Sequence, residues 1–349
     1  MILFVSKYPN LENDPSGWLQ RVAAIDAFFK DKNRIYLDIS FRKNLIPKIV
    51  YKEEKLEVYK LNFFLHFIIV LYFALKAKFV YVHTSNNSLK TLPVYFIKKV
   101  ITDMHGIPPE EFKICYKNDK ASRFYGFLES FIIKKSYKII AVTNAMKNHY
   151  YTKYKNIKAE ILVIPIFDNS ETSPHAQHKE GELYNIIYSG GVENWQNVDF
   201  MLEAISKIKD KFKFVILTGC EKEFKELLKQ YELEEYINPI KVPKSEVYNY
   251  YRDADFGFIP REDNIVNRVA CPTKLIEYIM SGVIPLVLQP EIGDFNEFKY
   301  SYLTVENLLA GNIPSDDEIN EMRNNNYTVI ENMRKITTEG IKKLLSECN

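Results

Sequence analysis

The stretch from Tyr251 to Leu288 reads YRDADFGFIPREDNIVNRVACPTKLIEYIMSGVIPLVL. Its apolar and polar runs predict a strand over Asp255–Pro260, followed by a polar basic loop over Arg261–Cys271. A helix over Pro272–Ser281 and a second strand over Val283–Leu288 come next. Strands that alternate with helices build a parallel α/β sheet. The stretch therefore predicts an α/β fold, with a loop and a helix start at the carboxyl end of a strand, where such sheets bind ligands.

The start of the predicted helix has the composition of an anion site. Pro272 suits the first helical turn, because its missing N–H costs nothing there. The free N–H groups of Thr273 and Lys274 would then point out of a helix end that carries positive partial charge. Three cationic side chains crowd this end, those of Arg261, Arg268 and Lys274. Glu277 lies one turn in, so the helix start is suited to hold a diphosphate beside a carboxylate that binds ribose hydroxyls.

The run PTKLIEYIMSG and the apolar strand after it resemble the nucleotide-binding segment of GT-B glycosyltransferases of family 4, the retaining sugar-nucleotide enzymes. Two more runs resemble the family in the expected order, DMHGIPPEEF over Asp103–Phe112 and IIYSGGVENWQNVDFMLEAI over Ile186–Ile205. The resemblance implies that the helix start binds the donor diphosphate and that Glu277 binds the donor ribose. It also implies that the reaction needs neither a divalent metal nor a cofactor.

Asp103 and His105 fall on one side of the predicted strand Val100–His105, at its carboxyl end. The resemblance implies that His105 faces the donor sugar and the reaction centre, where it would orient hydroxyls or stabilise developing charge. Asp103 would fix the tautomer of the imidazole, and both are candidate catalytic residues. The alternative is a histidine that caps a turn.

Three glycines complete the candidate donor site. Gly17, in DPSGW, opens a predicted helix after the first strand and permits a close backbone approach to a ligand, although a simple turn explains it equally well. Gly190 and Gly191 end a strand in the second half of the chain. The resemblance implies that they face the diphosphate, and a structural turn is again the alternative.

The chain departs from the family in the basic residues that follow this glycine pair. The family places an arginine or lysine just after the glycine and a lysine a few residues later, where this chain has Val192, Glu193 and Gln196. We hypothesise that Arg261 and Arg268 supply the missing charge, because charge-assisted hydrogen bonds contribute about 1.5–3 kcal/mol each.

A second departure concerns acidic residues. The family pairs its helix glutamate with another one eight positions earlier, and Val269 stands there in this chain. Glu262 or Asp263 is the candidate substitute from the loop. The run Asp253–Asp255 reads DxD, a metal-binding pattern in other glycosyltransferases, but its place at a helix end and strand start argues against a metal.

Apolar runs alternate with helical periodicity along the rest of the chain. Further predicted strands are Ile2–Ser6, Arg34–Ile39, Phe79–His83, Lys138–Thr143, Glu160–Pro165, Asn185–Tyr188, Lys213–Thr218 and Pro239–Val242. Two successive sets predict two doubly wound, Rossmann-like parallel-sheet domains that face a central cleft. The polar stretch Asp168–Gly181 separates an acceptor-side domain, 1–167, from a donor-binding domain, 182–324. The resemblance suggests that a helix over about 325–349 packs back on the first domain.

The composition is that of a globular protein, with 46% hydrophobic and 26% charged residues. A net charge of +2 gives no indication of a nucleic-acid partner. Four scattered cysteines without metal spacing favour a reduced, cytoplasmic protein. Met1 leads straight into an apolar strand, so no signal peptide is expected.

Two segments of the first half are candidates for peripheral contact with an anionic membrane. Leu61–Leu75 is apolar but, as a helix of about 22 Å, too short for the ~30 Å hydrocarbon core. Phe124–Lys135 combines aromatic residues with a lysine pair. Core packing explains both segments nearly as well.

The resemblance thus implies a metal-independent, retaining glycosyltransferase of the hexosyltransferase type, with a nucleotide-diphosphate sugar as co-substrate. The resemblance also implies that the acceptor is a lipid-linked or surface-polysaccharide glycan at the cytoplasmic face of the membrane. Two alternatives stay open: a sugar-nucleotide epimerase on the same fold, and a non-catalytic subunit that binds a nucleotide sugar.

Overall fold

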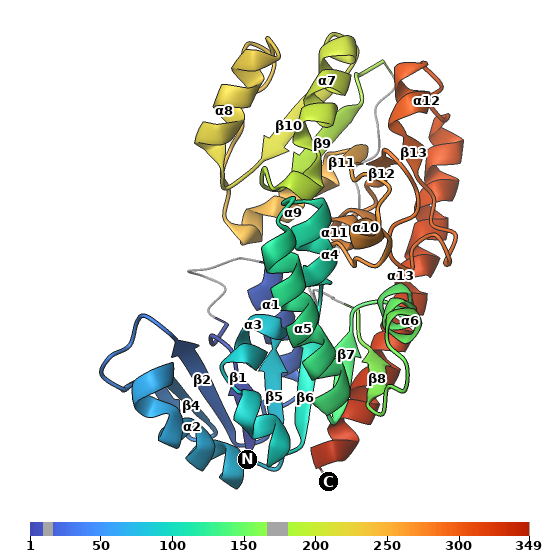
Figure 1. Cartoon of the computed structure of the whole chain (residues 1–349). Helices are drawn as coiled ribbons and strands as arrows, with labels where there is room; N and C mark the ends of the chain where they lie inside the picture. The colour runs from blue at the N-terminus through green and yellow to red at the C-terminus, as the bar shows by residue number, and fades with distance from the viewer. Residues whose placement is uncertain (10–16, 166–180, 349) are drawn as a thin grey trace. The chain divides into compact units, whose positions relative to one another are not determined.

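The computed structural model describes residues 1–9, 17–165 and 181–348, and its contacts divide the chain into two compact units (Figure 1). Unit 1 comprises Met1–Asp168 and Lys335–Asn349, and unit 2 comprises Asn169–Arg334. The long helix α13 (Asp316–Leu345) begins in unit 2, and its residues from Lys335 onward belong to unit 1.

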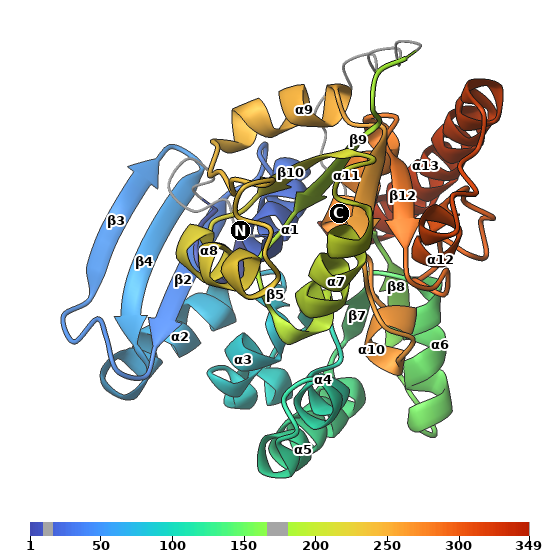
Figure 2. The same ribbon diagram turned by 90° about the horizontal axis from the view of Figure 1, so that it is seen from above.

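Unit 1 contains one sheet with the strand order β3-β4-β2-β1-β5-β6-β7-β8. The strands are β1 (Ile2–Val5), β2 (Arg34–Ser40), β3 (Lys48–Glu53), β4 (Leu56–Asn62), β5 (Val80–His83), β6 (Val100–Met104), β7 (Lys138–Ala141) and β8 (Glu160–Val163). All neighbours are parallel except β3 and β4, which form an antiparallel pair at the edge of the sheet (Figure 2). A parallel sheet brings the carboxyl ends of its strands to one edge, which is where a ligand site is expected.

Helices cover both faces of this sheet. They are α1 (Gly17–Ala27), α2 (Phe63–Lys76), α3 (Thr84–Leu89), the 3₁₀-helix η1 (Leu92–Phe96), α4 (Pro108–Ile114), α5 (Asp119–Lys135), α6 (Asn144–Lys153) and the 3₁₀-helix η3 (Ser346–Cys348). Apolar residues of α1 and of the end of α13 pack on one face, and those of α2, η1 and α5 pack on the other. The unit is therefore doubly wound.

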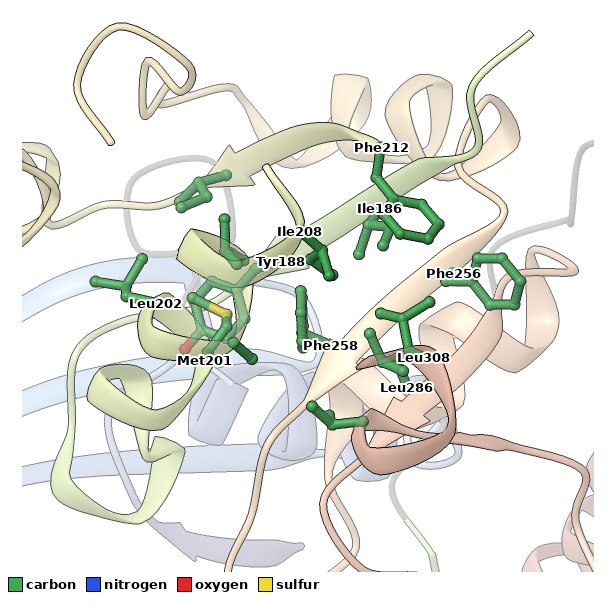
Figure 3. Packing of buried hydrophobic residues seen from close by; sticks show 14 of the residues in the cluster. Ile186, Tyr188, Met201, Leu202, Ile208, Phe212, Phe256, Phe258, Leu286 and Leu308 are labelled. Atoms are coloured by element: carbon green, nitrogen blue, oxygen red, sulfur yellow. The ribbon is translucent and has the colours of Figure 1, made fainter. Parts of the chain in front are cut away.

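Unit 2 contains a second parallel sheet with the order β10-β9-β11-β12-β13. Its elements are β9 (Asn185–Ser189), the 3₁₀-helix η2 (Asn194–Gln196), α7 (Val198–Ile208), β10 (Lys213–Leu217), α8 (Glu221–Gln230), α9 (Lys244–Arg252), β11 (Phe256–Ile259), α10 (Ile265–Arg268), α11 (Thr273–Met280), β12 (Ile284–Val287), β13 (Leu303–Thr304) and α12 (Val305–Leu309). Phe256 and Phe258 of the central strand point into a core that α7 closes with Met201 and Leu202 (Figure 3).

The predicted fold class, α/β with two doubly wound Rossmann-like parallel-sheet domains, is confirmed. The prediction missed β3, β4 and β13, and it gave Pro239–Val242 as a strand, whereas Ile240 forms only an isolated bridge with Leu217. The predicted helix Leu61–Leu75 is α2, which begins after Asn62 because that side chain caps the N–H groups of Phe64 and Leu65. No helix among the described residues is long and apolar enough to cross a membrane.

Candidate functional site

The start of α11 lies after the carboxyl end of β11, beyond the short helix α10. Pro272 is the N-cap residue, one position before the predicted first turn, and its carbonyl accepts hydrogen bonds from Leu275 and Ile276. Within the described residues, the backbone N–H groups of Thr273 and Lys274 donate to no protein acceptor. Two free N–H groups at a helix start favour an anionic ligand.

Glu277 is a buried carboxylate one turn into this helix, with 2% of its surface exposed. Its Oε2 accepts hydrogen bonds from the Tyr251 hydroxyl at 3.0 Å and from Lys274 Nζ at 2.7 Å. Its Oε1 has no hydrogen-bond partner among the residues that the structure describes. A buried charged group without a full set of partners is costly, so Oε1 is suited to accept hydrogen bonds from a ligand.

Lys274 keeps its charge in this arrangement. Burial opposes the charged form of Lys274, but the attraction and hydrogen bond of Glu277 outweigh burial, and the pKa of Lys274 is raised. About a third of the lysine side chain is exposed, so the ammonium group lies between the buried carboxylate and solvent. A cation at the helix start adds to the field that the two free N–H groups provide.

Tyr278, the next residue of α11, fixes the helix against the sheet. A Cβ atom on Gly257 of β11 would lie 2.5 Å from the Tyr278 ring, so the ring can pack there only because residue 257 is a glycine. The Tyr278 hydroxyl accepts a hydrogen bond from the backbone N–H of Ser189 at 2.9 Å. This bond ties α11 to the end of β9, immediately before Gly190.

Gly190 and Gly191 continue β9 into a turn. The N–H of Gly190 donates to Leu217, and the carbonyl of Gly191 accepts from the Tyr188 hydroxyl at 2.7 Å. A Cβ atom on Gly190 would lie 2.7 Å from that hydroxyl, which explains why a glycine is needed there. The position of the Tyr188 ring thus favours glycine at 190 on structural grounds, and the position at the carboxyl end of β9 is the one predicted for a donor loop.

Arg261 and Arg268 belong to the loop between β11 and α11, but their surroundings differ. Arg261 is partly buried and donates from Nη1 to Asn267 Oδ1 at 3.2 Å. Arg268 is half-exposed and forms a bidentate ion pair with Asp263, with distances of 2.6 and 2.8 Å. The Arg268 charge is therefore shared with a carboxylate of the same loop, which makes Arg268 less available as a phosphate ligand.

Asn267 is a residue that the sequence reasoning missed. It is fully buried, and its side chain accepts from Arg261 and donates to the carbonyl of Glu262 at 2.9 Å. Its backbone carbonyl also accepts from Gly293 N. Asn267 therefore holds the basic loop in shape, a role that only a structure reveals because a lone polar residue in a loop carries no distinctive pattern.

In unit 1, Asp103 lies at the carboxyl end of β6 and is completely buried. Arg21 of α1 binds both of its oxygens at 3.0 Å, and the Tyr81 hydroxyl donates to it as well. Arg21 also donates to the carbonyls of Ile164 and Pro165. Burial alone would raise the pKa of Asp103, but the Arg21 guanidinium and His83 together outweigh burial and hold the pKa well below its usual range.

This geometry corrects the expected relation between Asp103 and His105. Among the described residues no hydrogen bond joins the two side chains, because the carboxylate is bound by Arg21 and Tyr81. His105 instead stacks on His83, with ring centroids 4.7 Å apart. Asp103 thus holds α1 and the strand ends together, and it does not fix the His105 tautomer directly.

His83, at the end of β5, was not among the predicted site residues. Its side chain is fully buried, stacks on Trp18 with centroids 5.9 Å apart, and places Nδ1 3.6 Å from Asp103 Oδ2. Burial, with the neighbouring His83 adding to it, lowers the pKa of His105 to about 3. His105 is therefore neutral at physiological pH and can act through hydrogen bonds, but not as a cation.

The structure describes only part of the DPSGW segment, and the DxD run belongs to no metal-binding group among the described residues. Gly17 begins α1, whereas Asp14–Ser16 lie outside the described residues. Asp255 of the DxD run is buried and accepts from Asn185 N at 2.9 Å, and Asp253 pairs with Arg252. No group of three potential metal-ligating side chains occurs in the described ranges, and metal independence stays a prediction.

One comparison with known protein families concerns unit 2. Residues 184–298 match the family model of the Glycosyl transferases group 1. The matched region thus includes β9, the glycine pair, the basic loop and the whole of α11. No curated protein sequence matches the chain.

Solved structures match nearly the whole chain. HepE of Anabaena, in complex with UDP and glucose, has a TM-score of 0.72 at 14% identity, with 99% of each chain covered. Sucrose-phosphate synthase of Thermosynechococcus elongatus has a TM-score of 0.70 at 11% identity, covering 99% of this chain and 97% of its own. A trehalose-6-phosphate protein of E. coli bound with UDP-2-fluoro glucose has a TM-score of 0.67 at 11% identity, covering 99% and 98%. At these identities the matches establish the fold, which is that of GT-B proteins.

Proposed function

We propose that the protein is a retaining, metal-independent glycosyltransferase of family 4 type that transfers a hexosyl group from a nucleotide-diphosphate sugar. The proposed acceptor is a hydroxyl of a lipid-linked or surface-polysaccharide glycan at the cytoplasmic face of the membrane. The observation that carries the proposal is the buried Glu277, whose Oε1 has no partner within the described residues, one turn from the free N–H groups that start α11. That arrangement offers one place for a diphosphate and one for a ribose diol.

In the proposed reaction the bond between the sugar anomeric carbon and the diphosphate oxygen breaks, and a bond to the acceptor oxygen forms on the same face. The acceptor loses its proton, and the nucleoside diphosphate leaves. The N–H groups of Thr273 and Lys274, with the Lys274 ammonium and Arg261, would stabilise the charge that develops on the leaving diphosphate. His105, neutral at physiological pH, would orient sugar hydroxyls.

The proposal is tested by thermal unfolding with UDP, GDP, ADP, CMP and TDP in the presence of EDTA. A ligand at 100 times its dissociation constant stabilises by about 2.7 kcal/mol, which gives a measurable shift of the melting temperature. We expect one nucleoside diphosphate to stabilise the protein, and UDP is the first to try because HepE was solved with it. A well-folded protein that no nucleotide stabilises would contradict the donor site and the transferase with it.

A non-catalytic nucleotide-sugar-binding subunit is the second candidate. It is favoured by Val192 and Gln196, where the family has basic residues, and by the engagement of Arg268 with Asp263. Such a protein would bind the nucleotide but consume no donor with any acceptor. An epimerase would convert the nucleotide sugar without an acceptor, so product analysis with and without acceptor separates the three functions.

Arg261→Ala is expected to weaken the binding of the stabilising nucleoside diphosphate by about tenfold or more, because a charge-assisted hydrogen bond contributes about 1.5–3 kcal/mol. Isothermal titration of wild type and variant measures the loss. Arg252→Ala is the matched control, since Arg252 is an exposed arginine of unit 2 that pairs only with the adjacent Asp253 in the described contacts. Equal affinities of Arg261→Ala and wild type would show that Arg261 does not supply the missing charge.

A further inference from the structure

One surface of unit 1 exposes many large apolar side chains. Five belong to α2 and three to the loop before β3 and to β3 itself; they are Phe64, Leu65, Ile68, Tyr72, Leu75, Leu45, Ile46 and Ile49, and we call them the apolar patch. Ile68 is 82% exposed and Ile46 is 81% exposed. A contiguous exposed patch of this kind marks a surface that binds something apolar.

The patch is a single surface. Ile49, Ile68 and Tyr72 line one groove of about 520 Å³, which joins β3 to α2. At the start of α2, the Phe41 ring lies 5.9 Å from the Phe64 ring, centroid to centroid. The exposed side of α2 therefore adjoins β3 along this groove, while Val70 and Ala74 pack inward on the sheet.

Basic residues outnumber acidic ones around the patch, although Glu53 ends β3 and Asp38, Glu54 and Glu57 lie in the neighbouring strands and turn. Residues 39–52 contain four lysines and arginines, and residues 58–102 contain six lysines, with no aspartate or glutamate in either segment. Such a charge pattern is complementary to an anionic surface. A protein partner with an apolar face would not require so one-sided a charge.

A basic pocket of about 600 Å³ adjoins the start of α2. Its charged lining residues are Arg42, Lys43, Lys60, Lys90 and one acid, Asp38. Asn62, the cap of α2, donates to the carbonyls of Phe41 and Lys43, so the pocket wall and the helix start are joined. The pocket lies at the carboxyl ends of β2 and β4, the ligand edge of the sheet that also carries His105.

We propose that unit 1 binds a phosphate-bearing membrane lipid, with the phosphate in the basic pocket and the apolar patch in the bilayer interface. The 14-residue α2 spans about 21 Å, less than the ~30 Å hydrocarbon core, and a short helix that is apolar on its outer side lies in the interface. Lysines bind phosphate as compact charges. The inference deepens the proposed function by naming a lipid phosphate as the acceptor class, and that part rests on it.

Vesicle co-sedimentation tests the proposal. The protein is expected to bind phosphatidylcholine vesicles that contain phosphatidylglycerol, and to bind pure phosphatidylcholine vesicles much more weakly. Ile68→Asp is expected to weaken binding by about tenfold or more, since burying an isoleucine contributes about 1.5–3 kcal/mol. The double variant Arg42→Ala, Lys43→Ala is expected to weaken it by about fivefold for each lost charge.

Two control variants lie on unit 2: Leu183→Asp replaces an exposed apolar residue and Lys229→Ala an exposed lysine, and neither is expected to change vesicle binding. Equal binding of Ile68→Asp and wild type would overturn the proposal. The proposal would also be overturned if the wild-type protein did not bind vesicles but formed a dimer in light scattering, and if Ile68→Asp were monomeric. The nucleotide-induced melting shift of Ile68→Asp should equal that of wild type, so failure of the lipid site and failure of the donor site are distinguishable.

Discussion

Asp103→Asn is expected to lower the free energy of unfolding by about 3–5 kcal/mol, because it leaves the buried Arg21 guanidinium without its counter-charge. Arg21 would keep only its bonds to the carbonyls of Ile164 and Pro165. Urea unfolding followed by tryptophan fluorescence measures the change. The chain has two tryptophans, so a Trp195→Phe background leaves Trp18, on α1 beside this pair, as the reporter of unit 1.

The pH dependence of this loss has a definite sign. The folded-state pKa of Asp103 lies below its unfolded value of about 3.9, so the carboxylate stabilises wild type above about pH 4. As the pH falls further toward the folded-state pKa, wild type loses this contribution and Asp103→Asn does not. The difference between the two should therefore shrink in acid.

Glu331→Gln is the matched control, because Glu331 forms an exposed ion pair with Arg334 at 2.8 Å. Exposed pairs contribute about 0–1 kcal/mol, so the control should unfold close to wild type. If Asp103→Asn unfolded with the control, the buried pair would not be a main support of the strand ends in unit 1.

The elements that sequence reasoning located best are those with a clear period. The predicted helix Pro272–Ser281 contains α11, and predicted strands such as Ile2–Ser6 and Val100–His105 match β1 and β6 to within one residue. The β3–β4 hairpin was missed because its outer strand is exposed along its whole length, with charged residues among its apolar ones. A short edge strand owes its conformation to its neighbour, and no local pattern records that neighbour.

The candidate site likewise contains features that a local sequence pattern predicts and features that it does not. The place of Glu277 one turn into a helix was predictable because the helix start and Glu277 lie within a few residues of each other in one segment. The partners of the predicted residues were not, since Tyr251 reaches Glu277 from another helix and Arg21 reaches Asp103 across 82 positions of the chain. His83 was overlooked for a similar reason, because only the register of β5 and β6 brings it beside Asp103.

Glu277→Ala is expected to weaken the binding of the stabilising nucleoside diphosphate by about ten- to a hundredfold, because hydrogen bonds to a charged group contribute about 1.5–3 kcal/mol. The reason lies in Oε1, which is buried and has no partner in the described part of the chain, so a ribose hydroxyl would satisfy it. Titration calorimetry with wild type and variant measures the loss. The fold should persist, because Lys274, about a third exposed, can turn its freed ammonium group to solvent.

Two further variants show whether the loss belongs to the carboxylate. Glu277→Gln keeps an acceptor oxygen but removes the charge, and should fall between wild type and Glu277→Ala. Glu203→Ala removes an exposed glutamate of the same unit, paired with Lys207 at 2.7 Å, and should bind nucleotide like wild type. If Glu277→Ala stayed folded and bound the nucleotide with unchanged affinity, the ribose would not bind at Glu277 of α11. In that outcome the free N–H groups at the helix start could still hold a phosphate, but the buried carboxylate would be a structural group that anchors Tyr251 and Lys274.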